Sequence, residues 1–309
     1  MTGRLFLWNI IKKYDDIRRV NMKYMELVRR GQAELFKAGI PNADFDAWVL
    51  VEKVCKVSKT EYFVRMHEEV EEDKVKEFFA AIEKRKTHYP LQYIIGEWEF
   101  MGLPFKVNHD VLIPRSDTEI LAEKAVNVIT TVYEKSKETI KVLDLCCGTG
   151  CIGISVAKMC ANTEVVCADI SDKAVSVCKQ NILINKATNV RAIISDLFEN
   201  VQGRFHIITC NPPYIKTDDL KTLMPEVRDH EPWLALDGDK DGLKFYRKII
   251  DVCKQYLVYD GYIMFEIGYD QAEAVKQMLL EHGYSDIEVL KDLPGNDRTV
   301  VGIRRKSYV

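Results

Sequence analysis

Residues 141–169 read KVLDLCCGTGCIGISVAKMCANTEVVCAD and contain the pattern that decides the fold. The apolar run 141–145 is typical of a buried strand, and the small residues 146–150 then form a turn. Residues 151–159 predict an apolar helix, and a second apolar strand follows that ends at Asp169. A strand, a helix and a second strand make a βαβ unit, so the sequence predicts an α/β fold with a parallel sheet.

The glycines of the turn match a nucleotide-binding pattern. Gly148, Gly150 and Gly153 have the spacing Gly-x-Gly-x-x-Gly, and Asp169 follows about 20 residues later. Such glycines let a ligand approach the backbone, and the acidic residue binds ribose hydroxyl groups. The pattern by itself leaves an NAD-dependent oxidoreductase open as an alternative.

Three features favour S-adenosylmethionine as the cofactor. Asp144 lies near the end of the first strand, where a carboxylate suits a cationic amino-acid group and would repel a pyrophosphate. The βαβ unit begins near residue 140, after a helical region, and no second nucleotide-binding half follows it. An Asn-Pro-Pro-Tyr sequence also follows a later strand of the predicted sheet.

A third strand, 190–195, ends beside Asp196. This carboxylate could accept a hydrogen bond from the adenine amino group while Leu197 or Phe198 covers the ring; a helix or turn cap would account for Asp196 equally well. The predicted cofactor-binding residues are Asp144, Cys146, Cys147, Gly148, Thr149, Gly150, Asp169, Asp196, Leu197 and Asn211.

The Asn-Pro-Pro-Tyr sequence is residues 211–214, directly after the buried strand predicted for 205–210. The prolines end the strand because they have no N–H, and Pro212 keeps Asn211 out of the helical region. The Asn211 side-chain carbonyl and the Pro212 backbone carbonyl could accept both hydrogens of a planar NH₂ group that lies against Tyr214. This arrangement predicts a grip for an amide or amino-purine nitrogen that faces an electrophile; a rigid turn without chemistry is the alternative.

A helix is predicted from the Ile-Pro-Arg-Ser segment around Arg115 to about Tyr133. Ser116 and Glu119 have the spacing of a capping box. Arg115 stands in the constrained loop before this helix, so it is a candidate active-site contact, with an ordinary surface position as the alternative.

The composition is that of a globular protein. The chain has 309 residues, of which 47% are hydrophobic and 29% charged, and a net charge of -3. This length suggests two domains, and the charge does not favour direct binding to a nucleic-acid backbone. No apolar stretch reaches the roughly 18 residues of a membrane span.

The cysteines contain no Cys-x-x-Cys pair, so we expect no zinc site and a reducing, cytoplasmic location. Calcium is also excluded, because the Asp-rich run 237–242 has Lys248 where an EF-hand needs glutamate.

The sequence predicts three parts. Residues 1–88 predict an N-terminal helical bundle for partner recognition, in which 1–21 form an extension or precede a true start at Met22. Residues 89–110 predict a hairpin linker, and 111–309 predict the catalytic domain.

Taken together, these segments resemble the class I methyltransferases, and specifically the release factor glutamine N5-methyltransferases, over nearly the whole chain from Met22. The resemblance is carried by the segments 90–96, 111–115, 142–145, 211–215, 231–232 with 235–236, 241–243 and 296–298. It implies a Rossmann-like sheet of seven strands with the last antiparallel, a small N-terminal helical domain, and S-adenosyl-L-methionine as methyl donor. It also implies that peptide chain release factors are the partners and that the methyl acceptor is the glutamine of their Gly-Gly-Gln motif. Cys146 replaces the usual first glycine of the cofactor loop, where a positive φ would strain it.

The predicted catalytic residues are Asn211, Pro212 and Tyr214, and the predicted substrate-binding residues are these with Pro213 and Arg115; no metal is expected. An adenine-N6 DNA methyltransferase could use the same grip, but the chain lacks a basic target-recognition domain. Glutamine methylation of a ribosomal protein also stays open, as does a non-catalytic role in translation that involves only cofactor binding. We expect no membrane association.

Overall fold

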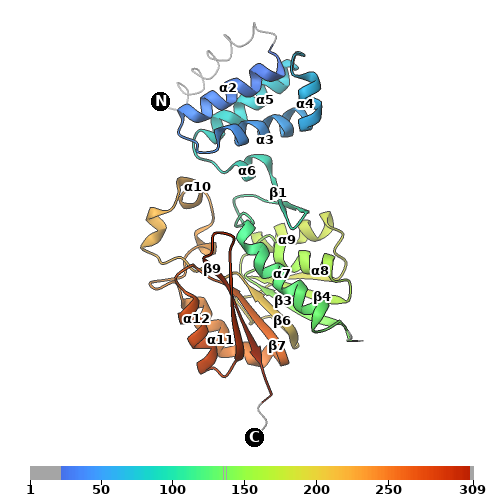
Figure 1. Ribbon diagram of the computed structural model, residues 1–309, viewed down its shortest axis with the longest axis vertical. Helices are drawn as coiled ribbons and strands as arrows, with labels where there is room; N and C mark the ends of the chain where they lie inside the picture. Colours follow the sequence, from blue (N-terminus) through green and yellow to red (C-terminus); the bar gives the residue numbers. More distant parts are fainter. Residues whose placement is uncertain (1–21, 135, 137, 307–309) are drawn as a thin grey trace. The chain divides into compact units, whose positions relative to one another are not determined.

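The computed structural model describes residues 22–134, 136 and 138–306 (Figure 1). The extension predicted for residues 1–21 lies outside the described residues. The chain divides after Ile95 into two compact units, which are described separately below.

The first unit is helical. Its helices are α2 (Tyr24–Lys37), α3 (Ala43–Cys55), α4 (Lys59–Arg65), α5 (Glu72–Arg85) and α6 (Leu91–Ile95). Fully buried side chains such as Leu27, Leu50 and Phe78 form its core. Helix α2 approaches α5 closely at Gly31, where an added Cβ would lie 2.5 Å from the Phe78 ring. The aromatic residues that the sequence places on helix faces therefore build a core.

Two local features of this unit differ from the sequence-based expectation. Helix α4 was not predicted, although Ser58 and Glu61 form a capping box in which each side chain bonds the other's backbone N–H. Residues 91–95 form helix α6, and not the extended structure expected for them, so the hairpin itself begins only at Glu97.

The second unit contains a hairpin and a seven-stranded sheet. The hairpin is β1 (Glu97–Phe100) with β2 (Leu103–Lys106). The sheet strands are β3 (Ile140–Leu145), β4 (Thr163–Asp169), β5 (Val190–Ile194), β6 (Phe205–Cys210), β7 (Leu257–Glu266), β8 (Ser285–Lys291) and β9 (Asp297–Arg304). Their spatial order is β5-β4-β3-β6-β7-β9-β8. The strands from β3 to β7 are parallel, whereas β9 is antiparallel to both of its neighbours. The seven-stranded α/β sheet with an antiparallel last strand is confirmed.

Helices cover both faces of the sheet (Figure 1). Helices α7 (Ser116–Thr131), α8 (Cys151–Met159) and α9 (Asp172–Ile184) pack on one face, and α11 (Lys244–Tyr256) and α12 (Ala272–Glu281) pack on the other. Strand β3 alternates between these two layers, because Val142 belongs to the first core and Leu143 and Leu145 belong to the second. Burial of both faces explains why the parallel strands are almost continuously apolar.

The capping box predicted before α7 is wrong. Arg115 is the N-cap residue and makes no side-chain cap, and Ser116 is already helical. The Glu119 carboxylate accepts the backbone N–H of Met101 at 2.6 Å, so it ties α7 to the turn of the hairpin. A tertiary contact has here replaced the local one.

Within the described part of the chain, no helix is long and apolar enough to span a bilayer.

Candidate active site

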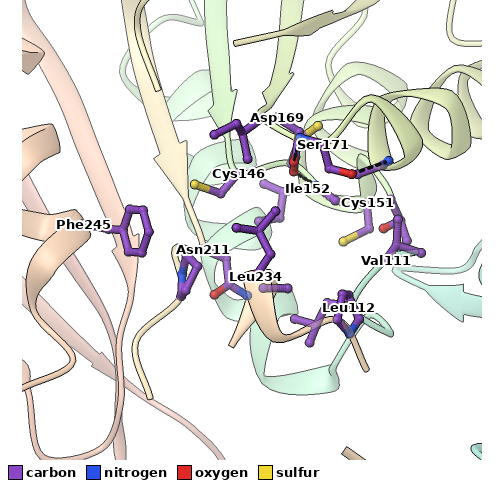
Figure 2. Close-up of a pocket in the computed structure, with 18 of the residues that line it drawn as sticks. Val111, Leu112, Cys146, Cys151, Ile152, Asp169, Ser171, Asn211, Leu234 and Phe245 are labelled. Carbon is purple, nitrogen blue, oxygen red and sulfur yellow. Dashed lines mark hydrogen bonds between the residues drawn. The ribbon is translucent and has the colours of Figure 1, made fainter. Parts of the chain in front are cut away.

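A pocket of about 290 Å³ opens at the carboxyl ends of β3, β4, β5 and β6 (Figure 2). This edge is where open parallel sheets bind ligands, and the volume is close to the roughly 300–1,000 Å³ that is usual for small-molecule sites. Val111, Leu112 and Ile152 give the pocket an apolar wall, while Leu234 and Phe245 come from the chain after β6. In Figure 2 Phe245 lies across the opening from Val111.

The turn after β3 forms the floor of the pocket. Cys146, Gly148 and Gly150 all have positive φ, at 54°, 52° and 78°. Cys146 therefore adopts the strained conformation that the sequence expectation allowed for, in a region that favours glycine. An added Cβ at Gly150 would lie 2.5 Å from the Cys178 sulfur, whereas Gly148 has nothing within 4 Å of that position. Gly148 thus leaves open space for a ligand, and Gly150 permits close packing of α9.

Asp169 ends β4 and lines the pocket. Its Oδ2 accepts the Gly148 N–H at 2.8 Å, and its Oδ1 accepts the Ser171 N–H at 2.9 Å. Burial raises the pKa of this carboxyl, and the two backbone N–H donors oppose the shift. Each oxygen keeps a further lone pair, so the carboxylate can also accept the hydroxyls of a ribose.

Asp144 is not brought to the pocket wall, in contrast to the predicted contact with an amino-acid group. It is fully buried, and its carboxylate accepts the Gly153 N–H at 3.0 Å and the Thr209 hydroxyl at 2.9 Å. Burial raises the pKa of Asp144 to about 7, against the effect of these two donors. The carboxyl therefore fixes the start of α8 to strands β3 and β6.

The segment after β5 contributes Ser195, Asp196 and Leu197 to the pocket. The Ser195 hydroxyl donates to the Leu197 carbonyl at 2.8 Å, and Leu197 has a positive φ of 47°. Phe198 turns away instead, is 5% exposed, and stacks on Tyr256 with ring centroids 4.5 Å apart. Of the two residues expected to cover an adenine ring, only Leu197 is in position to do so.

Asn211 and Pro213 line the pocket, but Pro212 and Tyr214 do not. The Asn211 Nδ2 donates to the Thr118 hydroxyl oxygen at 3.4 Å. The Tyr214 hydroxyl donates to the Glu266 carboxylate at 3.2 Å, and burial raises the pKa of Tyr214, so it stays a neutral donor. The structure therefore places the Asn211 amide at the pocket and turns the Tyr214 hydroxyl into the protein.

Arg115 lines the pocket and forms an ion pair with Glu231. The Arg115 side chain is 38% exposed, whereas that of Glu231 is 1% exposed. Burial raises the pKa of Glu231, and the Arg115 guanidinium opposes this shift. The arginine is thus held at the pocket wall by a buried carboxylate.

Thr118 and Glu266 are among the residues of the site that the sequence interpretation missed. Thr118 lines the pocket from the first turn of α7, and Glu266 lies behind it as the last residue of β7. Glu266 had a usable signal, because it is an acidic residue at the end of a buried strand, as Asp169 is. Thr118 had none, because a threonine in an amphipathic helix is unremarkable until its neighbours are known.

Of the ten residues predicted to bind the cofactor, eight line this one pocket: Cys146, Cys147, Gly148, Thr149, Asp169, Asp196, Leu197 and Asn211. Asp144 and Gly150 do not line it. Its apolar wall suits a purine, its glycine turn leaves room at Gly148, and Asp169 offers acceptors to ribose hydroxyls. The residues present therefore fit S-adenosylmethionine. Among the described residues, no group of three or more His, Cys, Asp or Glu side chains could hold a metal ion.

Comparison with known proteins agrees with this geometry. Residues 26–96 match the family described as the PrmC N-terminal domain, and residues 122–227 match the methyltransferase small domain. The chain is 38% identical over 297 residues to a release factor glutamine methyltransferase of Fusobacterium nucleatum, an alignment that covers 94% of this chain and 82% of the relative. It is 40% identical over 279 residues to the protein of the same name from Clostridium botulinum, covering 89% and 97%.

A solved structure shows the same fold. The hMettl16 catalytic domain, in complex with a MAT2A 3′UTR hairpin, matches with a TM-score of 0.54 at 13% identity, covering 76% of this chain and 83% of that one. At this identity the likeness concerns the fold alone.

Proposed function

This chain belongs to the release factor glutamine methyltransferase family and is a protein-glutamine N5-methyltransferase; from that premise we propose that it transfers a methyl group from S-adenosylmethionine to the glutamine of the Gly-Gly-Gln motif of peptide chain release factors. The single observation that supports this proposal most directly is the position of Asn211, which stands at the end of β6 and lines the same pocket as the glycine turn and Asp169. One cavity can then hold the cofactor and receive the acceptor amide.

Asp169, the turn 146–150 and Leu197 would hold the cofactor. Asp169 would bind the ribose, Leu197 would cover one side of the purine, and the space at Gly148 would accept the chain of the amino acid. When bound, S-adenosylmethionine supplies an electrophilic methyl group.

Asn211 would act on the acceptor. A glutamine side-chain nitrogen is a weak nucleophile because its lone pair is delocalised into the carbonyl. The Asn211 Oδ1 would accept one N–H bond of that amide, and the backbone carbonyl of Pro212, whose side chain does not line the pocket, would accept the other. Together they would orient the amide nitrogen and stabilise the positive charge that develops there. The stiff Pro-Pro backbone supports these acceptors, and the lost proton can pass to water after transfer.

Pro213 borders the pocket and Arg115 stands at its wall, where each would contact the loop that carries the substrate glutamine. Tyr214 would contribute by holding the platform, since its hydroxyl bonds the buried Glu266. The helical unit would select the release factor, and the site of action would be the cytoplasm, where translation ends.

A methylation assay tests this function. Purified protein with isotope-labelled S-adenosylmethionine should add one methyl group to a release factor, located on the Gly-Gly-Gln glutamine by mass spectrometry. A release factor with that glutamine changed to alanine is the matched control and should stay unlabelled. Labelling of DNA or of ribosomes, with none of the release factor, would refute the proposal.

Asn211→Ala tests the role of the platform. We expect labelling to fall at least about 100-fold, because an acceptor that acts mainly in the transition state is lost. The dissociation constant for S-adenosylmethionine, measured by calorimetry, should change little. Unchanged labelling would remove Asn211 from the mechanism.

A further inference from the structure

A buried carboxylate lies behind the substrate platform, and the steps above use it only as the partner of the Tyr214 hydroxyl. Glu266 is 2% exposed at the end of β7. Its Oε2 accepts the Thr118 hydroxyl at 2.6 Å, and its Oε1 accepts the Tyr214 hydroxyl at 3.2 Å. A charged group in the protein interior is costly unless its partners are placed well, so this position calls for an explanation.

Two hydroxyl donors and one cation act against the effect of burial on the Glu266 carboxyl. Burial raises its pKa, but the Thr118 and Tyr214 hydroxyls and the Arg298 guanidinium oppose the shift, while Asp117 adds to it. Arg298 is itself held by Asp292 at 2.9 Å and Asp117 at 3.4 Å, with 14% of its side chain exposed. The carboxylate thus faces one cation and two hydroxyl donors.

The carboxylate determines the direction of the next hydrogen bond. A carboxylate can only accept, and the Thr118 hydroxyl has a single hydrogen, which is therefore committed to Glu266. The Thr118 oxygen can then offer only a lone pair to Asn211, whose Nδ2 lies 3.4 Å away. Because the amide nitrogen turns towards Thr118, the Oδ1 of the same planar group must turn away from it.

We propose that Thr118 and Glu266 are positioning residues that fix the orientation of the Asn211 carboxamide, so that Oδ1 and not the NH₂ group meets the substrate. This inference rests on the proposed function of Asn211. The reverse orientation would set an NH₂ donor against the NH₂ group of the substrate glutamine, which leaves a buried donor unpaired and loses the acceptor. An Asn side chain is nearly symmetric in shape, so steric packing alone discriminates poorly between the two orientations.

The first test compares Thr118→Val with Thr118→Ser. Valine keeps the shape and removes the hydroxyl, whereas serine keeps the hydroxyl and removes a methyl group. We expect Thr118→Val to lower kcat for release factor methylation about 10- to 100-fold, as for one lost positioning hydrogen bond. Thr118→Ser should stay within about threefold of the parent enzyme in the same measurement. The cofactor dissociation constant should be similar in both variants.

The second test is Glu266→Gln. The new amide can donate to the Thr118 oxygen, which frees the Thr118 hydrogen to bond the Asn211 Oδ1 and favours the reversed orientation. We expect kcat to fall with little change in cofactor affinity. Thermal unfolding establishes that the variant is folded; if it is not, the Thr118 pair decides the question.

Equal kcat values for the valine and serine variants would overturn the inference, whether both are normal or both are low, because the hydroxyl would then be irrelevant. An inactive parent enzyme would instead refute the proposed function. The two failures are therefore distinguishable in one series of assays.

Discussion

The Asp169 carboxylate accepts the backbone N–H of Gly148 at 2.8 Å, and this contact joins the end of β4 to the turn after β3. The residue expected to bind ribose therefore also holds the backbone on which the rest of the cofactor would lie. Loss of its side chain should damage both the ribose contact and the turn.

Asp169→Ala should weaken S-adenosylmethionine binding by roughly 100-fold, since hydrogen bonds to a charged group contribute about 1.5–3 kcal/mol. Asp169→Asn keeps one acceptor oxygen, so its affinity for S-adenosylmethionine should lie between those of the alanine variant and the parent. Calorimetry checks both values. Because burial raises the pKa of Asp169, the affinity of the parent for S-adenosylmethionine should fall at acidic pH. An alanine variant that binds the cofactor as tightly as the parent would contradict this role of Asp169.

Asp144→Asn should change how stability depends on pH. Burial raises the Asp144 pKa to about 7, against about 3.9 for an unfolded aspartate. Between these values the folded state holds a proton that the unfolded state releases, so the parent loses stability as pH rises through this window and levels off above it. The slope is at most about 1.4 kcal/mol per pH unit.

Asparagine fits this site, because its oxygen can accept from Gly153 and its nitrogen can donate to Thr209, whose hydroxyl also reaches the Leu143 carbonyl at 3.4 Å. Urea unfolding at pH 5 and pH 8 measures the effect. The variant should gain stability relative to the parent at the higher pH, and an equal difference at both pH values would argue against the raised pKa.

Gly150→Ala should destabilise the protein by more than about 3 kcal/mol, because it combines a positive φ with overpacking against Cys178. Gly203→Ala is the matched control: its φ is +90°, but nothing lies within 4 Å of the added Cβ. Gly203→Ala should lower the free energy of unfolding by only about 1–2 kcal/mol. Chemical denaturation of both variants separates the contact from the backbone strain, and equal losses would show that the contact is unimportant.

Cys146→Val tests the cost of a side chain at the usual glycine position. Cys146 has a φ of 54°, where a β-branched side chain is more strained than cysteine. We expect the free energy of unfolding of Cys146→Val to be about 1–3 kcal/mol lower than that of Cys146→Gly, because glycine removes the strain altogether. Thermal melting compares the two variants, and equal melting temperatures would mean that the turn relaxes freely.

Arg115→Ala should lower stability by about 1–3 kcal/mol, because it leaves the buried Glu231 carboxylate without its cation. The figure lies below that for a fully buried pair, since the Arg115 side chain is 38% exposed and screened by solvent. In a Glu231→Gln background, Arg115→Ala should lower the free energy of unfolding by much less. Additive losses in this double-mutant cycle would show that the two residues do not interact.

The two strand-end carboxylates show what the local sequence can predict and what it cannot. Asp144 and Asp169 both follow an apolar run, and the sequence assigns both of them to the cofactor. The tertiary structure separates them, because Asp144 lies one residue before the end of β3 and bonds the start of α8, whereas Asp169 is the last residue of β4 and reaches the pocket. Asp144 stands opposite Cys167, two residues before Asp169, so both carboxylates are on the same face of the sheet and differ in their position along the strands.

The sequence by itself determined the sheet, the glycine turn and the proline-stiffened end of β6, because strand periodicity and turn chemistry act between near neighbours. Only the tertiary structure decided which partners these groups have. Glu231 meets Arg115, and Glu266 meets both Thr118 and Tyr214, across separations of 116, 148 and 52 residues. Such contacts depend on how the layers pack around the sheet, and no local pattern records which side chains that packing brings together.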